Sequence, residues 1–195
     1  MLKSILFLVL LPLCALAEDV SIRDAASSEK KCASDICFPE ATLIAANKVP
    51  LRNIKKKKYL VFNLYVAALY VGDGITGVDG VLGDTPKKLV FRYLRDFTKE
   101  MLIENADKVL AKNPEIDLPA LKSRIDQINL GYAEGIREGD VYELEYQPGR
   151  GSTLIRNGKE FTTVPGLDFA KGYLGIWLSK YPMSEDLRDS LIRIK

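Results

Sequence analysis

Apolar and polar residues alternate with a period of two in several short segments, and the longest of these predicts the central strand of a sheet. Residues 59–71 read YLVFNLYVAALYV, with β-branched and aromatic side chains on both alternating faces. A strand that is covered on both faces has this composition. Residues 88–95 (KLVFRYLR) alternate as a second strand, with Leu89, Phe91 and Tyr93 on one face. We expect the segment 59–71 to form the core of the fold.

The apolar spacing changes to that of a helix after Thr98, a residue type that caps helix N-termini. This helical pattern ends at Asn113-Pro114, and a second helix is predicted over residues 118–132. The two helices are expected to form a pair across the sheet. Further helices are predicted over residues 166–179 and after Ser184.

Between these helices the chain returns to strand patterns. The face of the segment 141–146 that is expected to point inward consists of Tyr142, Leu144 and Tyr146. Asn157-Gly158 then separates two strand segments, residues 153–156 and 159–164. Both turn residues tolerate positive φ, so a two-residue type I′ hairpin is predicted.

The first residues have the pattern of an export signal. Lys3 precedes an apolar run over residues 5–14, and Ala15-Leu16-Ala17 places small residues where signal peptidase cleaves. A membrane anchor is the alternative, but a span requires roughly 20 apolar residues and Glu18 ends this run too early. We therefore expect residues 1–17 to be a cleaved signal peptide and the mature chain to be periplasmic or secreted.

Two cysteines, Cys32 and Cys37, would be the only thiols of that mature chain. In an oxidising compartment they are expected to form a short-loop disulfide. The alternative, a redox pair, more typically has the Cys-x-x-Cys spacing. Residues 18–38 are predicted to be a polar lead-in that carries this pair, and residues 39–195 to form the domain.

Composition excludes several kinds of chemistry. The 195 residues include 28 Lys plus Arg, 26 Asp plus Glu and no histidine. A net charge of +2 argues against a general nucleic-acid binder. Without histidine, Ser-His-Asp and Cys-His nucleophile systems and His-containing zinc sites are absent. Any catalysis would depend on Arg, Tyr, Thr, Asn or carboxylate groups.

Two groups of cations allow a functional interpretation. Lys55–Lys58 could attract anionic lipid headgroups, but four lysines at a predicted hairpin turn are more often solvated, so at most weak membrane-surface contact is expected. Arg52 lies among apolar neighbours before the most buried strand. A partly buried guanidinium requires a partner, either a structural carboxylate or a ligand oxyanion, and the residues leave both open.

The order of these segments resembles the chalcone isomerase-like domain of bacterial exported proteins. Arg52 precedes the strand FNLYVAALYV, and FRYLRDF leads into a helix. The later matching segments are Gly139-Asp140, YQPGRGST at 146–153, Asn157-Gly158-Lys159, GLDFA at 166–170 and LGIWL at 174–178. The resemblance covers about residues 40–195, which is nearly all of the mature chain.

The resemblance implies an α+β fold, an open-faced sandwich in which an antiparallel sheet has a helical layer on one face and a ligand cleft between them. Plant enzymes of that fold close a ring within a phenolic enone, organised by an arginine, a threonine, a tyrosine and an asparagine. They need no cofactor and no metal. Other members are not enzymes and hold a fatty acid, whose carboxylate is received by arginine and tyrosine.

Carried over residue by residue, the resemblance matches Arg52 to the arginine and Asn105 to the asparagine. Thr98 stands where the tyrosine is expected, and Tyr65 stands where the threonine is expected. The predicted ligand-binding residues are thus Arg52, Tyr65, Thr98 and Asn105, and a catalytic set, if the protein is an enzyme, would be Arg52, Tyr65 and Asn105. The two departures weaken the case for ring closure.

Three hypotheses follow. The first is an exported, non-catalytic binder of a small amphipathic acid, fatty-acid-like, in the cleft between sheet and helices. The second is an intramolecular lyase or isomerase that acts on a chalcone-like phenolic enone. The third is a ligand-free envelope interaction protein. The sequence does not predict the oligomeric state.

Overall fold

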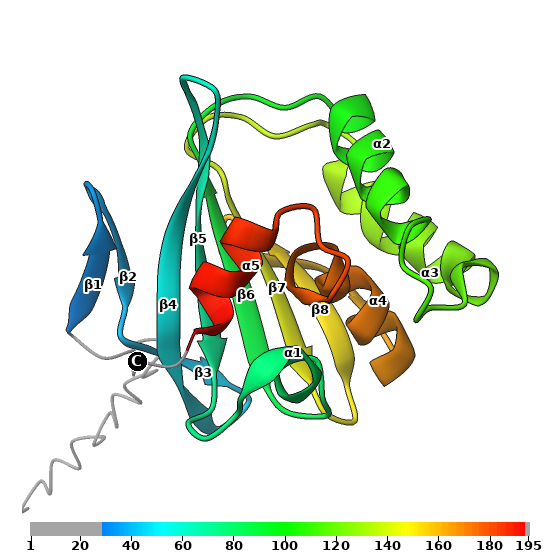
Figure 1. Cartoon of the computed structure of the whole chain (residues 1–195), viewed down its shortest axis with the longest axis horizontal. Helices are drawn as coiled ribbons and strands as arrows, with labels where there is room; N and C mark the ends of the chain where they lie inside the picture. Colours follow the sequence, from blue (N-terminus) through cyan, green and yellow to red (C-terminus); the bar gives the residue numbers. More distant parts are fainter. Residues whose placement is uncertain (1–28, 194–195) are drawn as a thin grey trace, which may run out of the picture.

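The computed structural model describes residues 29–193, so the predicted leader and its cleavage position lie outside the described residues (Figure 1). Seven strands form one sheet in the order β3-β4-β5-β6-β7-β8-β9, and every neighbouring pair is antiparallel. Their bounds are β3 Ala41–Ile44, β4 Asn47–Tyr59, β5 Phe62–Val71, β6 Lys87–Tyr93, β7 Val141–Gln147, β8 Gly151–Arg156 and β9 Lys159–Val164. A separate two-stranded sheet pairs β1 (Lys30–Ala33) with β2 (Ile36–Pro39).

The helices gather on one face of the large sheet, and the β1–β2 hairpin lies beside its other face (Figure 1). The helix bounds are α1 Gly77–Val81, α2 Lys99–Leu110, α3 Leu118–Asn129, α4 Leu167–Leu178 and α5 Glu185–Ile192, with a 3₁₀ turn, η2, at Leu130–Tyr132. This arrangement confirms the α+β class with an antiparallel sheet and a helical layer on one face. It also confirms the helix predicted over residues 166–179.

The central strand β5 separates two hydrophobic cores. Tyr65 and Leu69 point into the core beneath the helices, whereas Val66 and Tyr70 point into a smaller core on the opposite face. All residues from Tyr65 to Val71 are buried. The prediction of a strand covered on both faces is confirmed, because successive side chains of a strand point to opposite faces.

The second core depends on a segment that the sequence placed in a polar lead-in. Cys32 and Cys37 lie opposite each other in the β1–β2 hairpin, and their sulfurs are bonded. Phe38 is 6% exposed in this core, and the hydroxyl of Tyr70 donates to the carbonyl of Pro39 at 3.0 Å. The lead-in prediction therefore needs correction for residues 30–38. The disulfide closes the mostly polar hairpin within itself, whereas Phe38 and the hydrogen bond from Tyr70 attach the hairpin to the sheet.

The β4–β5 hairpin also differs from the prediction. Lys55–Lys58 belong to strand β4, and the turn is formed by Leu60 and Val61. Leu60 has a φ of 51°, which is a left-handed conformation that usually favours glycine or asparagine. The sequence predicts one continuous strand over residues 59–71, because the turn at Leu60 and Val61 contains no polar turn residue. The type I′ turn at Asn157-Gly158 is confirmed, with φ of 51° and 78°.

Candidate functional site

An aromatic layer fills the space between the sheet and α4, where the ligand cleft was expected. Tyr65 lies edge-on to Phe91, with ring centroids 5.3 Å apart, and Phe91 lies 4.9 Å from the ring of Trp177 on α4. Tyr93 continues the layer towards Tyr142 at 5.8 Å. Tyr65 is only 7% exposed, so its ring acts as a core residue.

The phenols of this layer are neutral at physiological pH. Burial raises the pKa of Tyr65 above its usual range, although a hydrogen bond with the Trp177 side chain opposes the rise. Burial likewise raises the pKa of Tyr93, and it raises that of Tyr142 to about 12. These hydroxyls can donate or accept hydrogen bonds, but they are not poised to serve as bases.

Arg52 has a partner that the sequence reasoning did not consider. It lies at an irregularity of the β4–β5 pairing, between Leu51 and Asn53. Its Nη1 donates to the carbonyl of Ile75 at 2.9 Å and its Nη2 to the carbonyl of Gly72 at 2.8 Å. The guanidinium thus holds the loop after β5, and its partners are backbone carbonyls rather than a carboxylate or a ligand oxyanion.

The other two predicted site residues lie on α2. The hydroxyl of Thr98 caps this helix by accepting from the N–H of Met101 at 3.3 Å. Asn105 is exposed and donates to the carbonyl of Met101 on its own helix at 2.7 Å. Thr98 does line a pocket of about 390 Å³, formed by residues 96–101 and 133–137.

The structure does not bring the four predicted residues into one site. Leu51 pairs with Tyr70, whereas Tyr65 pairs with Lys57, near the other end of the same hairpin. Five residues of a strand span roughly 16 Å. Arg52 and Tyr65 are therefore separated along the sheet, and the exposed side chain of Asn105 makes its bond within α2.

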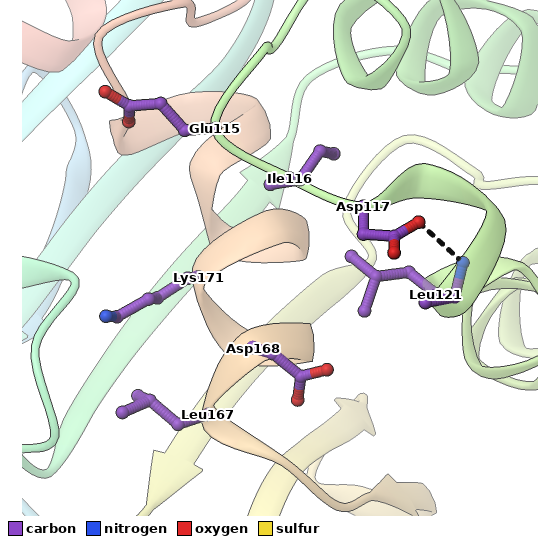
Figure 2. A pocket seen from close by; sticks show the side chains of 8 residues that line it. Glu115, Ile116, Asp117, Leu121, Leu167, Asp168 and Lys171 are labelled. Atoms are coloured by element: carbon purple, nitrogen blue, oxygen red, sulfur yellow. Dashed lines mark hydrogen bonds between the residues drawn. The ribbon is translucent and has the colours of Figure 1, made fainter.

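A groove that the sequence reasoning missed lies between the start of α3 and α4. Its volume is about 260 Å³, and Figure 2 shows Asp117 and Leu121 on one side, Asp168 and Lys171 along α4, and Ile116 between them. An adjoining pocket of about 300 Å³ shares three residues with it. The shared residues are Glu115, Ile116 and Lys171.

Gly166 allows α4 to begin at this groove. Its φ is 103°, and a Cβ at this position would collide with the Asp168 carboxylate and the Arg124 guanidinium. Arg124 Nη1 donates to Asp168 Oδ1 at 2.9 Å, and this hydrogen bond is the main cause that lowers the pKa of Asp168 to about 2. The ion pair joins α3 to α4, and its acid, Asp168, lines the groove.

Each acid of the groove has a partner, but one cation does not. Glu115 pairs with Lys180 at 3.0 Å, and Asp117 accepts from the N–H of Ala120 at 3.2 Å as the cap of α3. Within residues 29–193, Lys171 makes no hydrogen bond or ion pair, and it is exposed. The one signal in the sequence is the single cation, Lys171, in the mostly apolar helix LDFAKGYLGIWL, whose only other charged residue is Asp168 in the first turn.

No helix within residues 29–193 is long and apolar enough to cross a membrane. The same residues contain no group of three or more Cys, Asp or Glu side chains placed to hold a metal ion.

The fold and the groove together define an α+β protein with an antiparallel sheet and a candidate site in the helical layer on one face. A family profile described as chalcone isomerase-like matches residues 31–192. The chain belongs to the chalcone isomerase-like family.

Among solved structures, 37 chains match, one of which is a fatty-acid binding protein of Arabidopsis thaliana. The match has 12% sequence identity and a TM-score of 0.62, and it covers 84% of this chain and 96% of the Arabidopsis chain. At this identity the likeness shows the fold alone. A search of curated protein sequences finds no significant match.

Proposed function

We propose that the protein binds a small amphipathic acid, fatty-acid-like, without transforming it. In this proposal the apolar part of the ligand contacts Ile116, Leu121 and Leu167, and its carboxylate pairs with Lys171. The observation that carries the proposal is the composition of the α3–α4 groove, which combines apolar side chains with a cation that has no partner within residues 29–193. A charge-assisted bond to a carboxylate would satisfy that cation.

The size of the groove suits a small ligand. Ligand pockets commonly have volumes of about 300–1,000 Å³. The groove of about 260 Å³ continues into the adjoining pocket of about 300 Å³, which adds Leu82, Asn113 and Ser179 to its lining. An acyl chain in the first pocket could therefore extend past Ile116 into the second.

Three acids also line the groove, namely Glu115, Asp117 and Asp168, and each of them has a partner of its own. Lys171 is therefore the side chain of the lining that is left to pair with an anion. Lys87 lies buried beneath the α1 loop, and burial is the main cause that lowers its pKa to about 8. The charge of Asp84 opposes this change, and the charge of Lys171 adds a smaller lowering. The two ammonium groups thus repel each other. A bound carboxylate beside Lys171 would offset this repulsion.

The isomerase hypothesis has less support from the geometry. Ring closure needs the arginine, hydroxyl and amide groups around one substrate. Arg52 instead binds the carbonyls of Gly72 and Ile75, Tyr65 is buried in an aromatic layer, and Asn105 is exposed on α2. The fatty-acid binding protein of Arabidopsis has the same fold, which supports a binder.

The test is native mass spectrometry of residues 18–195, which contain every described element, followed by titration with dodecanoate. We expect bound dodecanoate and about tenfold weaker binding in Lys171→Gln, because a charge-assisted bond is lost.

Lys112→Gln is the matched control, since Lys112 is an exposed lysine without an ion pair within residues 29–193. If Lys171→Gln binds dodecanoate with full affinity and Arg52→Met loses that affinity, Arg52 and not Lys171 pairs with the ligand carboxylate. No binding by the unaltered protein would favour the ligand-free interaction protein.

The proposed location is the periplasm or the exterior of the cell. The leader pattern of residues 1–17 supports export, and the Cys32–Cys37 bond supports an oxidising compartment. The mass of the protein recovered after expression of the full chain tests this, because cleavage would leave Glu18 as the first residue. An intact N-terminus in an exported fraction would contradict the cleavage.

A further inference from the structure

The tip of the β4–β5 hairpin carries four consecutive large apolar side chains in solvent. Their exposed fractions are 66% for Tyr59, 80% for Leu60, 86% for Val61 and 51% for Phe62. Figure 1 shows this hairpin projecting beyond the rest of the sheet. Single exposed apolar residues are normal on a protein surface, but a contiguous group marks an interaction site.

The strand that leads to this tip is basic. Lys55 pairs with Asp186 at 3.0 Å, and Lys57 donates to the hydroxyl of Ser184 at 2.7 Å, so both are engaged with the start of α5. Lys56 and Lys58 make no hydrogen bond or ion pair within residues 29–193. Their long side chains are free to reach towards an anionic surface beside the tip.

A further cation lies next to the tip. The guanidinium of Arg95, in the loop after β6, is 4.7 Å from the centroid of the Phe62 ring. Asp96, the acid beside it, accepts from the N–H of Glu138 at 2.7 Å and is thereby held by the backbone. The apolar tip is thus flanked by Lys56, Lys58 and Arg95.

We propose that this tip docks the protein on the surface of an anionic lipid bilayer, with Leu60 and Val61 inserted among the acyl chains at the boundary with the headgroups. Amphipathic elements at membrane interfaces bury apolar groups by roughly 5–10 Å while basic side chains contact headgroups. Tyr59 is a residue type enriched at that boundary. Lys56, Lys58 and Arg95 contact the headgroup phosphates.

The size and charge of the tip favour a bilayer over a protein partner. A stable protein interface buries on the order of 1,200–2,000 Å² in total, which four residues cannot supply alone. A bilayer accepts a small insertion because the basic side chains add their attraction to the anionic surface. The docking surface lies on the β4–β5 hairpin and requires no ligand in the α3–α4 groove.

The experiment is cosedimentation of residues 18–195 with vesicles of phosphatidylcholine alone and with vesicles that contain equal amounts of phosphatidylcholine and phosphatidylglycerol. We expect binding to the mixed vesicles that weakens as salt is added. Lys56→Gln with Lys58→Gln should weaken it about fivefold for each lysine. Leu60→Asn with Val61→Ser should weaken it roughly tenfold or more, and asparagine suits the positive φ of Leu60.

Matched controls lie elsewhere on the surface. Leu130→Ser changes a side chain that is 64% exposed on η2, and Lys112→Gln with Lys159→Gln removes two exposed lysines outside the hairpin. These variants should bind as the unaltered protein does. A Val61→Trp variant adds a reporter at the tip, whose fluorescence should shift to shorter wavelength on the mixed vesicles.

Three outcomes would overturn the proposal. The first is equal, weak binding to both vesicle types. The second is equal loss of binding in the tip and control variants, with all variants folded by circular dichroism. The third is self-association that depends on Leu60 and Val61 without vesicle binding, which would assign the tip to a second copy of the chain.

Discussion

Arg52 shows how far a single residue can be interpreted from sequence. An arginine among apolar neighbours predicts a buried partner, and the structure contains one. The nature of that partner depends on the loop after β5, whose carbonyls at Gly72 and Ile75 turn towards the guanidinium. No local pattern reports the direction of a carbonyl in an irregular loop, so the choice between a structural and a ligand-binding role could not be made from sequence.

Arg52→Met should therefore act on stability. We expect the free energy of unfolding to fall by about 2 kcal/mol, because two hydrogen bonds from a charged group are lost. Urea unfolding measures this, with Arg92→Met, at an exposed position on β6, as the control. Unchanged stability of Arg52→Met would contradict the structural role.

Lys87 provides a second test at the scale of a residue, through pH. It is 1% exposed, and its Nζ donates to the carbonyls of Gly83 at 2.7 Å and Thr85 at 2.6 Å. Burial lowers its pKa from 10.5 to about 8. Between pH 8 and pH 10.5 the Lys87 side chain is more protonated in the unfolded chain than in the folded protein. The contribution of Lys87 to the free energy of unfolding therefore rises with pH over this window.

The comparison is urea unfolding of the unaltered protein and Lys87→Met at pH values from 8 to 10.5, the window set by that shift. The difference in stability between the two should move in favour of the unaltered protein as pH rises. A difference that stays constant would show that the ammonium is not penalised by burial.

At the scale of elements, a hairpin turn can be predicted from sequence where its residues are polar turn formers. Asn157-Gly158 identified its hairpin because these residue types adopt positive φ easily, and the structure has that turn. Leu60 and Val61 form a turn with apolar side chains, so the same reasoning extended the strand through them. An apolar turn of this kind leaves Leu60 and Val61 in solvent at the tip of the hairpin, where the docking surface is proposed.

The β1–β2 hairpin is expected to contribute to stability through Phe38. Phe38→Ala should lower the free energy of unfolding by about 3 kcal/mol, because a buried aromatic ring of the second core is removed. Phe161→Ala, at a ring that is 51% exposed, should change it by less than about 1 kcal/mol. Equal and small effects in the two variants would show that residues 30–38 are a lead-in after all.

At the scale of the whole molecule, the two faces of the sheet are covered by different elements. Its helix-covered face contains the aromatic layer and is overlaid by α4, on which the groove is built. Its other face is covered by the disulfide-closed hairpin that completes the second core. The order of motifs along the chain predicted the fold and the family, because each motif marks a strand, a turn or a cap.

The position of the ligand site could not be predicted in the same way. It depends on which gaps the side chains leave after packing, and Tyr65, Phe91 and Trp177 fill the expected cleft. Lys171 lies on a mostly apolar helix, and its place beside Ile116 and Leu121 becomes apparent only when α3 and α4 are placed together.

Photo-crosslinking with a fatty acid that carries a diazirine in its acyl chain, followed by peptide mapping of residues 18–195, tests directly whether the α3–α4 groove holds the ligand. We expect labelled peptides from residues 115–121 and 167–171, the two sides of the groove. Unlabelled dodecanoate should compete, and Lys171→Gln should reduce the label. Labelling that centres on Arg52 and the loop after β5, or labelling without competition, would show that the α3–α4 groove is not the ligand site.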